Sequence, residues 1–466
     1  MAWFRPLLCA LILMPSSHAL AQGTDSASVW RAASRLGYAP TPAIVQAIQQ
    51  HPQGARGWAL DQIELAYRSS QEPPNVPESL ASFAQPLPLL AEAYRRERQA
   101  QAMVQSNATG EQFSRQVNQD SAAWRLLMCS KPELEPPLLA RLTEFWFNHF
   151  NVFSGKGSVR PFIGHYVAYA IRPNSVGHVE ILLLGSARHP AMLFYLDQAQ
   201  SVAEGLSGIP GQIRGLNENY ARELMELHTV GVNAGYSQND IRELARILTG
   251  WTVDPRASDG FRFAPGRHDQ GSKTVLGRTF GAKGEAEGRE VMTLLARHPA
   301  TAQRIALRLA QWFVSDDPPT DLVQELSNTF QRSTGDIRAM RRTVVNSDAF
   351  WSTGNTLFKT PYDYACSVLT VTQNSEIGPV LRYLSIVGQP IHAWQTPDGY
   401  NTSAATWLSP EALTRRADLA YAVTNNASNV EYLQDFLKLE TRSRIPHVPA
   451  RTRALLTLSS PDFMKK

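Results

Sequence analysis

The chain has 466 residues, 43% of them hydrophobic and 18% charged, with a formal net charge of +4. These values are typical of a globular protein with an ample core and exclude a disordered chain. The small and dispersed charge gives no basis for nucleic-acid binding.

The N-terminus is predicted to be a signal peptide covering residues 1–21. Arg5 supplies a positive charge, residues 6–14 form a short apolar segment, and residues 19–21 fit a cleavage site. The apolar segment is too short to anchor the chain in a bilayer, and no other stretch approaches the length of a transmembrane helix. We therefore expect a periplasmic or secreted protein without a transmembrane segment.

Helical periodicity and capping residues predict a mainly α protein with a large multi-helix globular fold. N-terminal helices occupy residues 22–70, and the proline-rich stretch 71–79 is a predicted linker to a helical core domain at 80–466. Helices of this domain, apart from those of residues 216–253, are expected at 89–105, 111–128, 137–153, 161–170, 176–184, 190–196, 286–296, 300–314, 322–330, 337–350, 362–372, 410–424, 432–439 and 451–458.

Residues 252–284 depart from the helical pattern. Three short segments, 261–263, 274–276 and 278–280, alternate in character and are separated by glycines, as hairpin strands are. They predict a small β-hairpin insert near residues 258–283.

Two cysteines, Cys129 and Cys366, lie beyond the predicted signal peptide. An oxidising compartment would allow them to pair. They are far apart in the sequence, however, and Cys129 belongs to an apolar helical patch. We expect two buried, unpaired thiols.

Residues 216–253 are predicted to form a helical hairpin around which the chain is organised. The first helix has an apolar side and a polar side, and the polar side carries Asn219, Arg222, Glu223 and Glu226. Ser237 followed by Asp240 resembles a capping box at the start of the second helix. A short link favours an antiparallel pair of helices.

Two interpretations of these polar residues remain open. In the structural interpretation, Arg222 pairs with Glu226 at i,i+4, and Glu223 pairs with Arg242 or Arg246 of the second helix. In the functional interpretation, Glu223 and Glu226 lie one turn apart on the same side and form a catalytic carboxylate site.

The hairpin also resembles the hallmark of a bacterial family catalogued as domain of unknown function number eighteen hundred. The segments that carry the resemblance are NENYAREL at 217–224, ELHT at 226–229 with Gly231, LTGW at 248–251, FWFNHF at 145–150, His268-Asp269 with Lys273, PDGY at 397–400 and WL at 407–408. The resemblance implies a large exported bacterial protein, often encoded beside a sulfatase- or phosphatase-like partner. It implies no established reaction.

Glu223, Glu226, His268 and Asp269 are the predicted catalytic residues. His268 and Asp269 fall on a loop of the predicted insert, where side chains can converge on a ligand. We expect the four residues to lie around one cleft, with His149 as a weaker fifth member. His149 is a candidate metal ligand, or alternatively a core residue of an aromatic helix face.

Other polar and aromatic residues are candidates for substrate binding. The predicted substrate-binding residues are Asn148, Asn219, Arg222, Lys273, Asp398 and Tyr400. The aromatic residues 145–147, with Tyr400 and Trp407, form either a platform for a polysaccharide ligand or part of the core. A divalent metal is the one cofactor considered, although no HExxH or CxxC spacing occurs.

Two classes of function follow. The first is an exported hydrolase or lyase that acts on an envelope or environmental glycan through carboxylate and histidine groups, with metal assistance as an option. The second is a non-catalytic binding or assembly factor that works with a secreted sulfatase-like partner. No serine-nucleophile, dinucleotide-binding or phosphate-loop motif supports a third.

Cleavage of the signal peptide is expected after Ala21. N-terminal sequencing of protein recovered from the producing cell should begin at Gln22, because small residues at positions 19 and 21 follow the apolar segment. Soluble cytoplasmic protein with an intact Met1 would contradict export.

Overall fold

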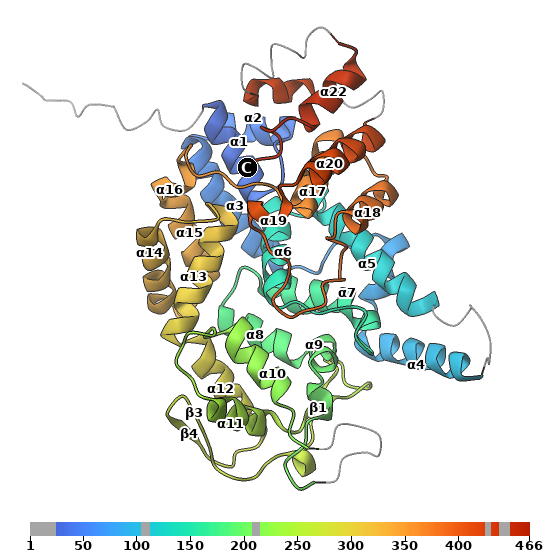
Figure 1. The fold of residues 1–466 in the computed structure, drawn as a ribbon, viewed down its shortest axis with the longest axis vertical. Coiled ribbons are helices and arrows are strands. Elements are labelled where there is room, and N and C mark those ends of the chain that lie inside the picture. The colour runs from blue at the N-terminus through green and yellow to red at the C-terminus, as the bar shows by residue number, and fades with distance from the viewer. Residues whose placement is uncertain (1–24, 104–111, 207–214, 425–429, 438–447) are drawn as a thin grey trace, which may run out of the picture.

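The computed structural model describes residues 25–103, 112–206, 215–424, 430–437 and 448–466, and the predicted signal peptide lies outside them. Helices make up most of this structure (Figure 1), and the strands form two small antiparallel sheets. The prediction of a mainly α fold with a small hairpin element is confirmed. None of the helices in this part of the chain has both the length and the apolar character needed to cross a lipid bilayer.

The helices follow the predicted order, with short 3-10 or π segments (η) between them. In chain order they are α1 (Ser26–Leu36), α2 (Pro42–Gln50), α3 (Gly54–Ser70), η1 (Glu78–Ala84), α4 (Leu87–Met103), α5 (Gln112–Ser130), α6 (Pro137–His149), η2 (Arg160–Phe162), α7 (Ile163–His165), η3 (Tyr166–Ile171), η4 (Arg172–Asn174), α8 (Val179–Arg188), α9 (Pro190–Tyr195), η5 (Gln198–Gln200), α10 (Glu218–Glu223), η6 (Leu224–His228), α11 (Gln238–Leu248), η7 (Pro265–Arg267), α12 (Glu285–Ala296), α13 (Pro299–Phe313), α14 (Thr320–Arg332), α15 (Ile337–Asn346), α16 (Asp348–Trp351), α17 (Pro361–Thr372), α18 (Ile377–Ile386), α19 (Ala404–Trp407), α20 (Pro410–Val423), η8 (Glu431–Phe436) and α22 (Ala450–Leu458). α18 is not among the predicted helices, and its first turn contains Gly378 and Pro379, residues that often interrupt helices.

Several helices begin at the capping residues that the sequence indicates. At the start of α2, Oγ1 of Thr41 accepts a hydrogen bond from the backbone N–H of Ile44, and Pro42 occupies the first helical position. At the start of α11, Ser237 and Asp240 form the reciprocal capping box. These side chains satisfy backbone N–H groups that have no partner within the helix.

The first helix of the predicted hairpin changes from an α-helix to a π-helix halfway along its length. It is α-helical over α10 and continues as the π segment η6. The backbone N–H of Gly231 then donates to the carbonyl oxygen of Met225 at 2.9 Å, and Gly231 has a φ of 87° that favours glycine. Single π segments within helices are frequent at functional sites.

The insert contains two antiparallel strand pairs. β1 (Trp251–Val253) pairs with β2 (Phe261–Phe263), and β3 (Lys273–Val275) pairs with β4 (Arg278–Phe280). Trp251 therefore begins a strand, whereas the sequence pattern places it at the end of a helix.

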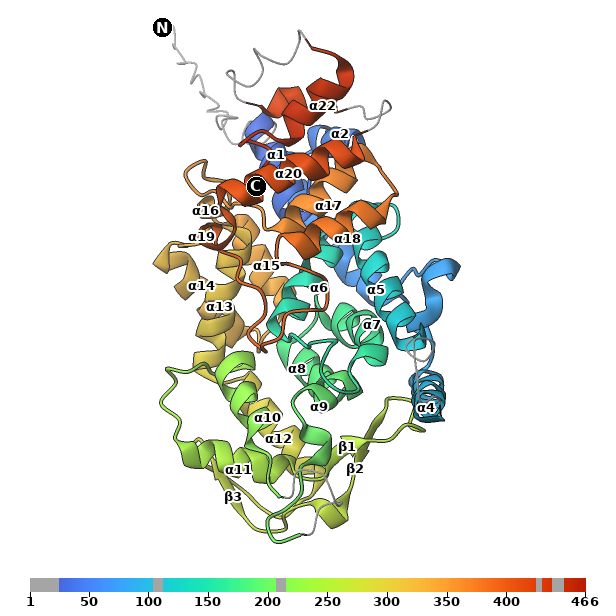
Figure 2. The same cartoon turned by 45° about the vertical axis from the view of Figure 1, so that its right-hand side comes forward.

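The helices form an elongated body (Figures 1 and 2). α1, α2, α20 and α22 lie at one end, and α10, α11, α12 and both sheets lie at the other. α6 lies between the two ends, with α13 and α14 on one side of it and α4 and α5 on the other. α6 therefore occupies a central position in the body.

One apolar core includes residues from both ends of the chain. Trp30 contacts Phe463 with ring centroids 6.1 Å apart, and Tyr38 contacts Tyr362 at 6.2 Å. The proline-rich stretch 71–79 lies against this body, since its Asn75 carbonyl accepts a hydrogen bond from the Trp124 indole at 3.0 Å. Packing thus continues across the predicted linker.

Cys129 of α5 and Cys366 of α17 form a disulfide, so the expectation of two unpaired thiols is wrong. The two Cα atoms are 5.6 Å apart, although 237 positions separate the residues in sequence. α5 and α17 pack against each other. This contact between distant helices has no local sequence signal.

Removal of this disulfide is expected to lower the free energy of unfolding by about 2–5 kcal/mol, because a cross-link restricts the unfolded chain. Urea unfolding of the Cys129→Ala/Cys366→Ala variant and of the oxidised protein measures the difference. A non-reduced digest should contain a peptide in which Cys129 is linked to Cys366. Recovery of both residues as free thiols would contradict the disulfide.

Candidate functional site

The four predicted catalytic residues and three of the predicted substrate-binding residues fall into two polar clusters. The insert cluster consists of Arg246, His268, Asp269, Lys273 and Glu287. The central cluster consists of Arg222, Glu223, Glu226, Arg304, Arg308 and Asp398. Within the described residues, no hydrogen bond or ion pair joins the two clusters.

The insert cluster has a fully buried centre. The side chains of His268, Lys273 and Glu287 are each 0% exposed. Nζ of Lys273 donates to Oε2 of Glu287 at 2.8 Å, and Nε2 of His268 lies 3.3 Å from Oε1 of the same carboxylate. Nδ1 of His268 donates to the Thr249 carbonyl oxygen at 2.9 Å, because a carbonyl oxygen can only accept.

Arg246 of α11 holds Asp269 at the edge of the insert cluster. Nε and Nη2 of Arg246 donate to the two oxygens of Asp269 at 2.8 and 2.9 Å. These hydrogen bonds lower the pKa of Asp269, against the opposing effect of burial. Glu243 also accepts hydrogen bonds from Arg246 and from the backbone N–H of Thr274, at 2.7 and 2.9 Å. The contacts fasten β3 to α11.

The hypothesis of one cleft that includes His268 and Asp269 gains no support from this arrangement. Glu287, which the sequence analysis does not single out, holds His268 and Lys273 in the interior. A charge in the interior is stable only with a partner. We therefore assign the insert cluster, including the candidate substrate ligand Lys273, to the attachment of the β insert.

The central cluster contains an ion pair that the sequence predicts. Arg222 lies 3.5 Å from Glu226 and 3.6 Å from Glu218, both at i,i+4 on one helix. Nη2 of Arg222 also donates to Gln238 of α11 at 3.0 Å. Asn219 is exposed, and its backbone N–H donates to Asn217. The Arg222–Glu226 part of the structural interpretation is therefore confirmed.

Glu223 behaves differently, and its predicted pairing with Arg242 or Arg246 is wrong. Arg242 binds Glu204 instead, at 2.8 Å, and Arg246 belongs to the insert cluster. Glu223 makes no hydrogen bond or ion pair with any residue that the structure describes. Burial raises the pKa of this half-buried carboxyl, and the negative charges of Glu226 and Asp398 add to the effect, while Arg222 opposes it.

Asp398 belongs to the segment between α18 and α19. This segment forms the long loop that runs from α18 toward the middle of the body (Figure 2). Its Oδ1 accepts hydrogen bonds from Nε1 of Trp394 at 2.9 Å and from Oγ1 of Thr396 at 2.6 Å. The hydroxyl of Tyr195 donates to the Gln395 carbonyl of this loop at 2.8 Å. Burial raises the pKa of Tyr195, and the charges of Glu223 and Asp398 contribute further. The predicted turn at residues 397–400 thus brings a second carboxylate to Glu223.

Asn148 and Tyr400 hold this loop in place. Nδ2 of Asn148 donates to the Tyr400 carbonyl at 2.9 Å, and the Tyr400 N–H donates back to Oδ1 of Asn148 at 2.7 Å. Gly399 lies between them with a φ of 74°, and a Cβ there would lie 2.0 Å from the Asn148 carbonyl oxygen. Only glycine fits this contact. The polar groups of these two predicted substrate ligands therefore position the loop.

The predicted aromatic platform divides into two parts. Phe145 and Trp146 belong to the buried core. The ring of Tyr400 lies 4.8 Å from that of Trp394 on the same loop and 6.5 Å from that of Trp407 in α19, measured between centroids. Trp394 and Tyr400 remain partly exposed beside Asp398.

Two arginines of α13 complete the central cluster and were not singled out by the sequence analysis. Nε of Arg304 donates to the Leu227 carbonyl at the end of η6, at 3.1 Å. Arg308, one turn later, makes no hydrogen bond or ion pair to the described residues. Burial, with a contribution from Arg304, lowers the pKa of Arg308 to about 10, and Asp398 opposes the shift. The guanidinium therefore stays charged at neutral pH. The i,i+4 spacing of the two arginines was the available sequence signal.

His149 lies behind this cluster in an aromatic environment formed by Phe145, Trp146 and Phe150. Its Nε2 donates to the His228 carbonyl at 3.0 Å. Burial lowers the pKa of both histidines, that of His228 to about 3, and Arg304 and Arg308 lower them further. Nδ1 of His149 and Nε2 of His228 are buried without a hydrogen-bond partner among the described residues.

A metal site at His149 gains no support from these residues. Within the described ranges, no group of three or more His, Cys, Asp or Glu side chains is arranged to hold a metal ion. Two imidazole nitrogens fall short of the three protein ligands that catalytic zinc sites use.

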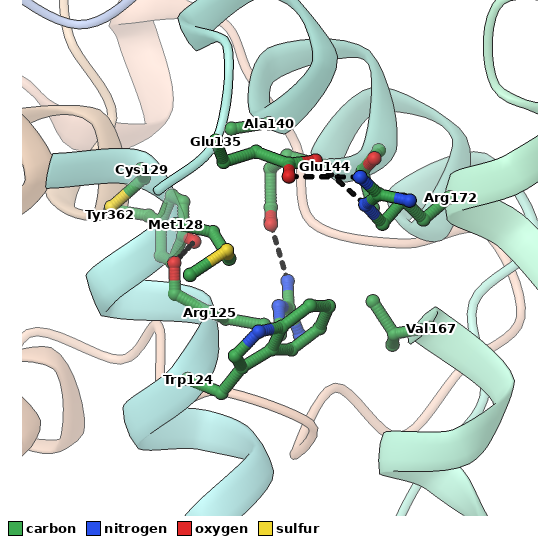
Figure 3. A pocket seen from close by; sticks show the side chains of 11 residues that line it. Trp124, Arg125, Met128, Cys129, Glu135, Ala140, Glu144, Val167, Arg172 and Tyr362 are labelled. Carbon is green, nitrogen blue, oxygen red and sulfur yellow. Dashed lines mark hydrogen bonds and ion pairs between the residues drawn. The ribbon is translucent and has the colours of Figure 1, made fainter. Parts of the chain in front are cut away.

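A separate cavity lies between α5, α6 and the segment that precedes α8 (Figure 3). The ion pairs Arg125–Glu144 and Arg172–Glu135 line it, and Nε of Arg172 lies 2.8 Å from Oε1 of Glu135. Its volume is about 20 Å³, which holds one water molecule and no saccharide. It is therefore not the substrate site.

The comparison with protein families places the chain. A family model described as "Protein of unknown function (DUF1800)" matches residues 31–465, so the chain belongs to this family. No curated protein and no solved structure matches it. The match confirms the resemblance seen in the sequence and includes both clusters. The description of the family names no reaction. A function for this chain must therefore be inferred from the side chains of the two clusters.

Lys273→Met is expected to lower the free energy of unfolding by about 3–5 kcal/mol, because it leaves the buried carboxylate of Glu287 without its cation. Arg289→Gln is the matched control. It removes an exposed ion pair with Glu285 on the surface of α12 and should change the free energy by less than about 1 kcal/mol. Urea unfolding measures both, and equal stability of the two variants would contradict the structural role.

Proposed function

We propose that this member of the DUF1800 family is an exported hydrolase or lyase that acts on a glycan of the cell envelope or environment, with Glu223 as general acid or base. The observation that supports this function is the half-buried carboxyl of Glu223, which has no partner among the described residues. Glu226 and Asp269, the other candidate carboxylates of the hairpin and insert, are paired with arginines. An unpaired carboxyl with a raised pKa is suited to proton transfer.

Asp398 is the second carboxylate that this chemistry needs. Both of its hydrogen bonds go to Oδ1, so Oδ2 accepts none from the described residues. In a hydrolysis, Glu223 gives a proton to the oxygen of the departing sugar as the glycosidic C–O bond breaks. Asp398 takes a proton from the water that forms the new C–O bond. Two carboxyl groups in different environments can divide these roles.

The aromatic residues next to Asp398 support a saccharide substrate. Trp394 and Tyr400 are partly exposed on the loop that carries Asp398, and aromatic faces present apolar area next to polar groups. The hydrogen bonds between Asn148 and Tyr400 hold that loop on α6. A fixed loop keeps a bound ring in one orientation relative to the carboxylates.

Glu223→Gln is expected to reduce turnover about 10²–10⁴-fold, because the proton donor is lost. Its thermal stability at pH 7 should be unchanged or higher by up to about 2 °C. The raised pKa means that the folded state binds this proton more tightly than the unfolded state. The contribution of Glu223 to stability is therefore present at low pH and is lost as pH rises through the raised pKa. If Glu223 acts as the acid, wild-type activity falls over the same pH range.

Release of reducing ends and of unsaturated products from a panel of polysaccharides distinguishes hydrolase from lyase activity. Glu218→Gln is the matched control, because Glu218 lies on the same helix and also contacts Arg222. It should keep activity within about twofold. Equal turnover by wild type and Glu223→Gln would contradict the catalytic role. Binding without turnover by the wild type would favour the alternative, a binding or assembly factor that works with a sulfatase-like secreted partner.

A further inference from the structure

Arg308 is a charged side chain without a partner in the part of the chain that the structure describes. Arg141 and Arg172 are buried and paired with Asp363 and Glu135. Arg341 also has no hydrogen-bond partner among the described residues, but its side chain is completely buried and no ligand can reach it. Arg308 is partly exposed, and it makes no hydrogen bond or ion pair with the described residues. Removing a guanidinium from bulk water without a counter-ion is unfavourable. An unpaired arginine that remains reachable is therefore suited to bind an external anion.

The surroundings of Arg308 strengthen this interpretation. Arg304 lies one turn earlier on α13, and only its Nε donates a hydrogen bond to the described residues, to the Leu227 carbonyl. His149 and His228 lie near both arginines and are neutral at pH 7, so they add no charge. Two neighbouring guanidinium groups repel each other, and a shared anion removes this repulsion.

The ion pairs of the central cluster leave Arg308 unmatched. Arg222 forms ion pairs with two carboxylates, those of Glu218 and Glu226. Arg308 forms no ion pair with a described residue. An anionic ligand would supply the counter-ion that Arg308 lacks among these residues.

We propose that Arg308, assisted by Arg304, binds a negatively charged group of the substrate, either a carboxylate or a sulfate ester, beside Asp398 and Glu223. The substrate class is therefore an acidic saccharide, built from uronic acids or carrying sulfate. The planar guanidinium donates two parallel hydrogen bonds to either group, which selects it over a neutral hydroxymethyl group. This inference rests on the proposed function only in placing the site at the central cluster. It does not require the reaction proposed there.

The test is a binding measurement that does not depend on turnover. The full chain, as wild type and as Glu223→Gln, is applied to an array of immobilised polysaccharides that are neutral, rich in uronic acid or sulfated. Both proteins should bind at least one acidic class about tenfold more tightly than the neutral class. The uronate and sulfate arms identify which group is bound.

Arg308→Gln should lose this preference and keep or increase its thermal stability, because it removes an unpaired charge. Arg308→Lys keeps the positive charge but loses the planar guanidinium and its two parallel N–H donors. This variant should bind acidic polysaccharides with intermediate affinity. Arg289→Gln, on the exposed surface of α12, controls for non-specific attraction of polyanions and should bind like the wild type.

Three results would overturn the inference: no preference for acidic polysaccharides, an unchanged preference in Arg308→Gln, or an equal loss in Arg289→Gln. If Arg308→Gln does not fold, Arg308 has a structural role and the inference is also wrong. A failure of the proposed catalysis gives a different result. The wild type would then bind acidic polysaccharides but would not turn them over.

Discussion

Charged side chains that leave water need a partner, and this requirement ties the helices of the protein together. Arg141 of α6 and Asp363 of α17 form a buried ion pair, to which Lys466 near the C-terminus also donates. Burial opposes the ionisation of Asp363, yet Arg141 and Lys466 hold its pKa below the ordinary value. Breaking such a pair leaves one buried charge unmatched, so helices joined in this way keep their relative positions.

The same requirement distinguishes the two polar clusters. In the insert cluster every buried charge is matched, and the side chains that match it come from α11, the insert and α12. In the central cluster, Glu223 and Arg308 have no partner among the described residues, although neighbouring charges shift the pKa of each. A ligand can supply the missing partner of an accessible charged group, and this contact makes binding favourable. Charged groups that are buried and already paired gain nothing from a ligand. The central cluster is therefore where chemistry is expected.

The position of Asp398 depends on a second constraint, the close contact between its loop and α6. Asn148 bonds the loop backbone in both directions, and Gly399 allows the two backbones to approach. Trp394 and Thr396 then orient the carboxylate from within the loop. These contacts fix the position of Asp398 relative to Glu223 of α10, although the two residues are far apart in the sequence. A mobile loop would not hold the carboxylate in one position.

The sequence alone determined the features that depend on near neighbours. Helix positions follow from a period of 3.6 residues, the start of α11 from its capping box, and the Arg222–Glu226 pair from the i,i+4 spacing of a helix. Tertiary structure alone decided that Cys129 meets Cys366, that Glu287 captures His268 and Lys273, and that Asp398 lies near Glu223. These contacts join segments whose distance in space is set by the packing of the whole core. Local periodicity carries no information about which helix packs against which, so the sequence showed the charged residues and only the fold showed which of them remain unpaired.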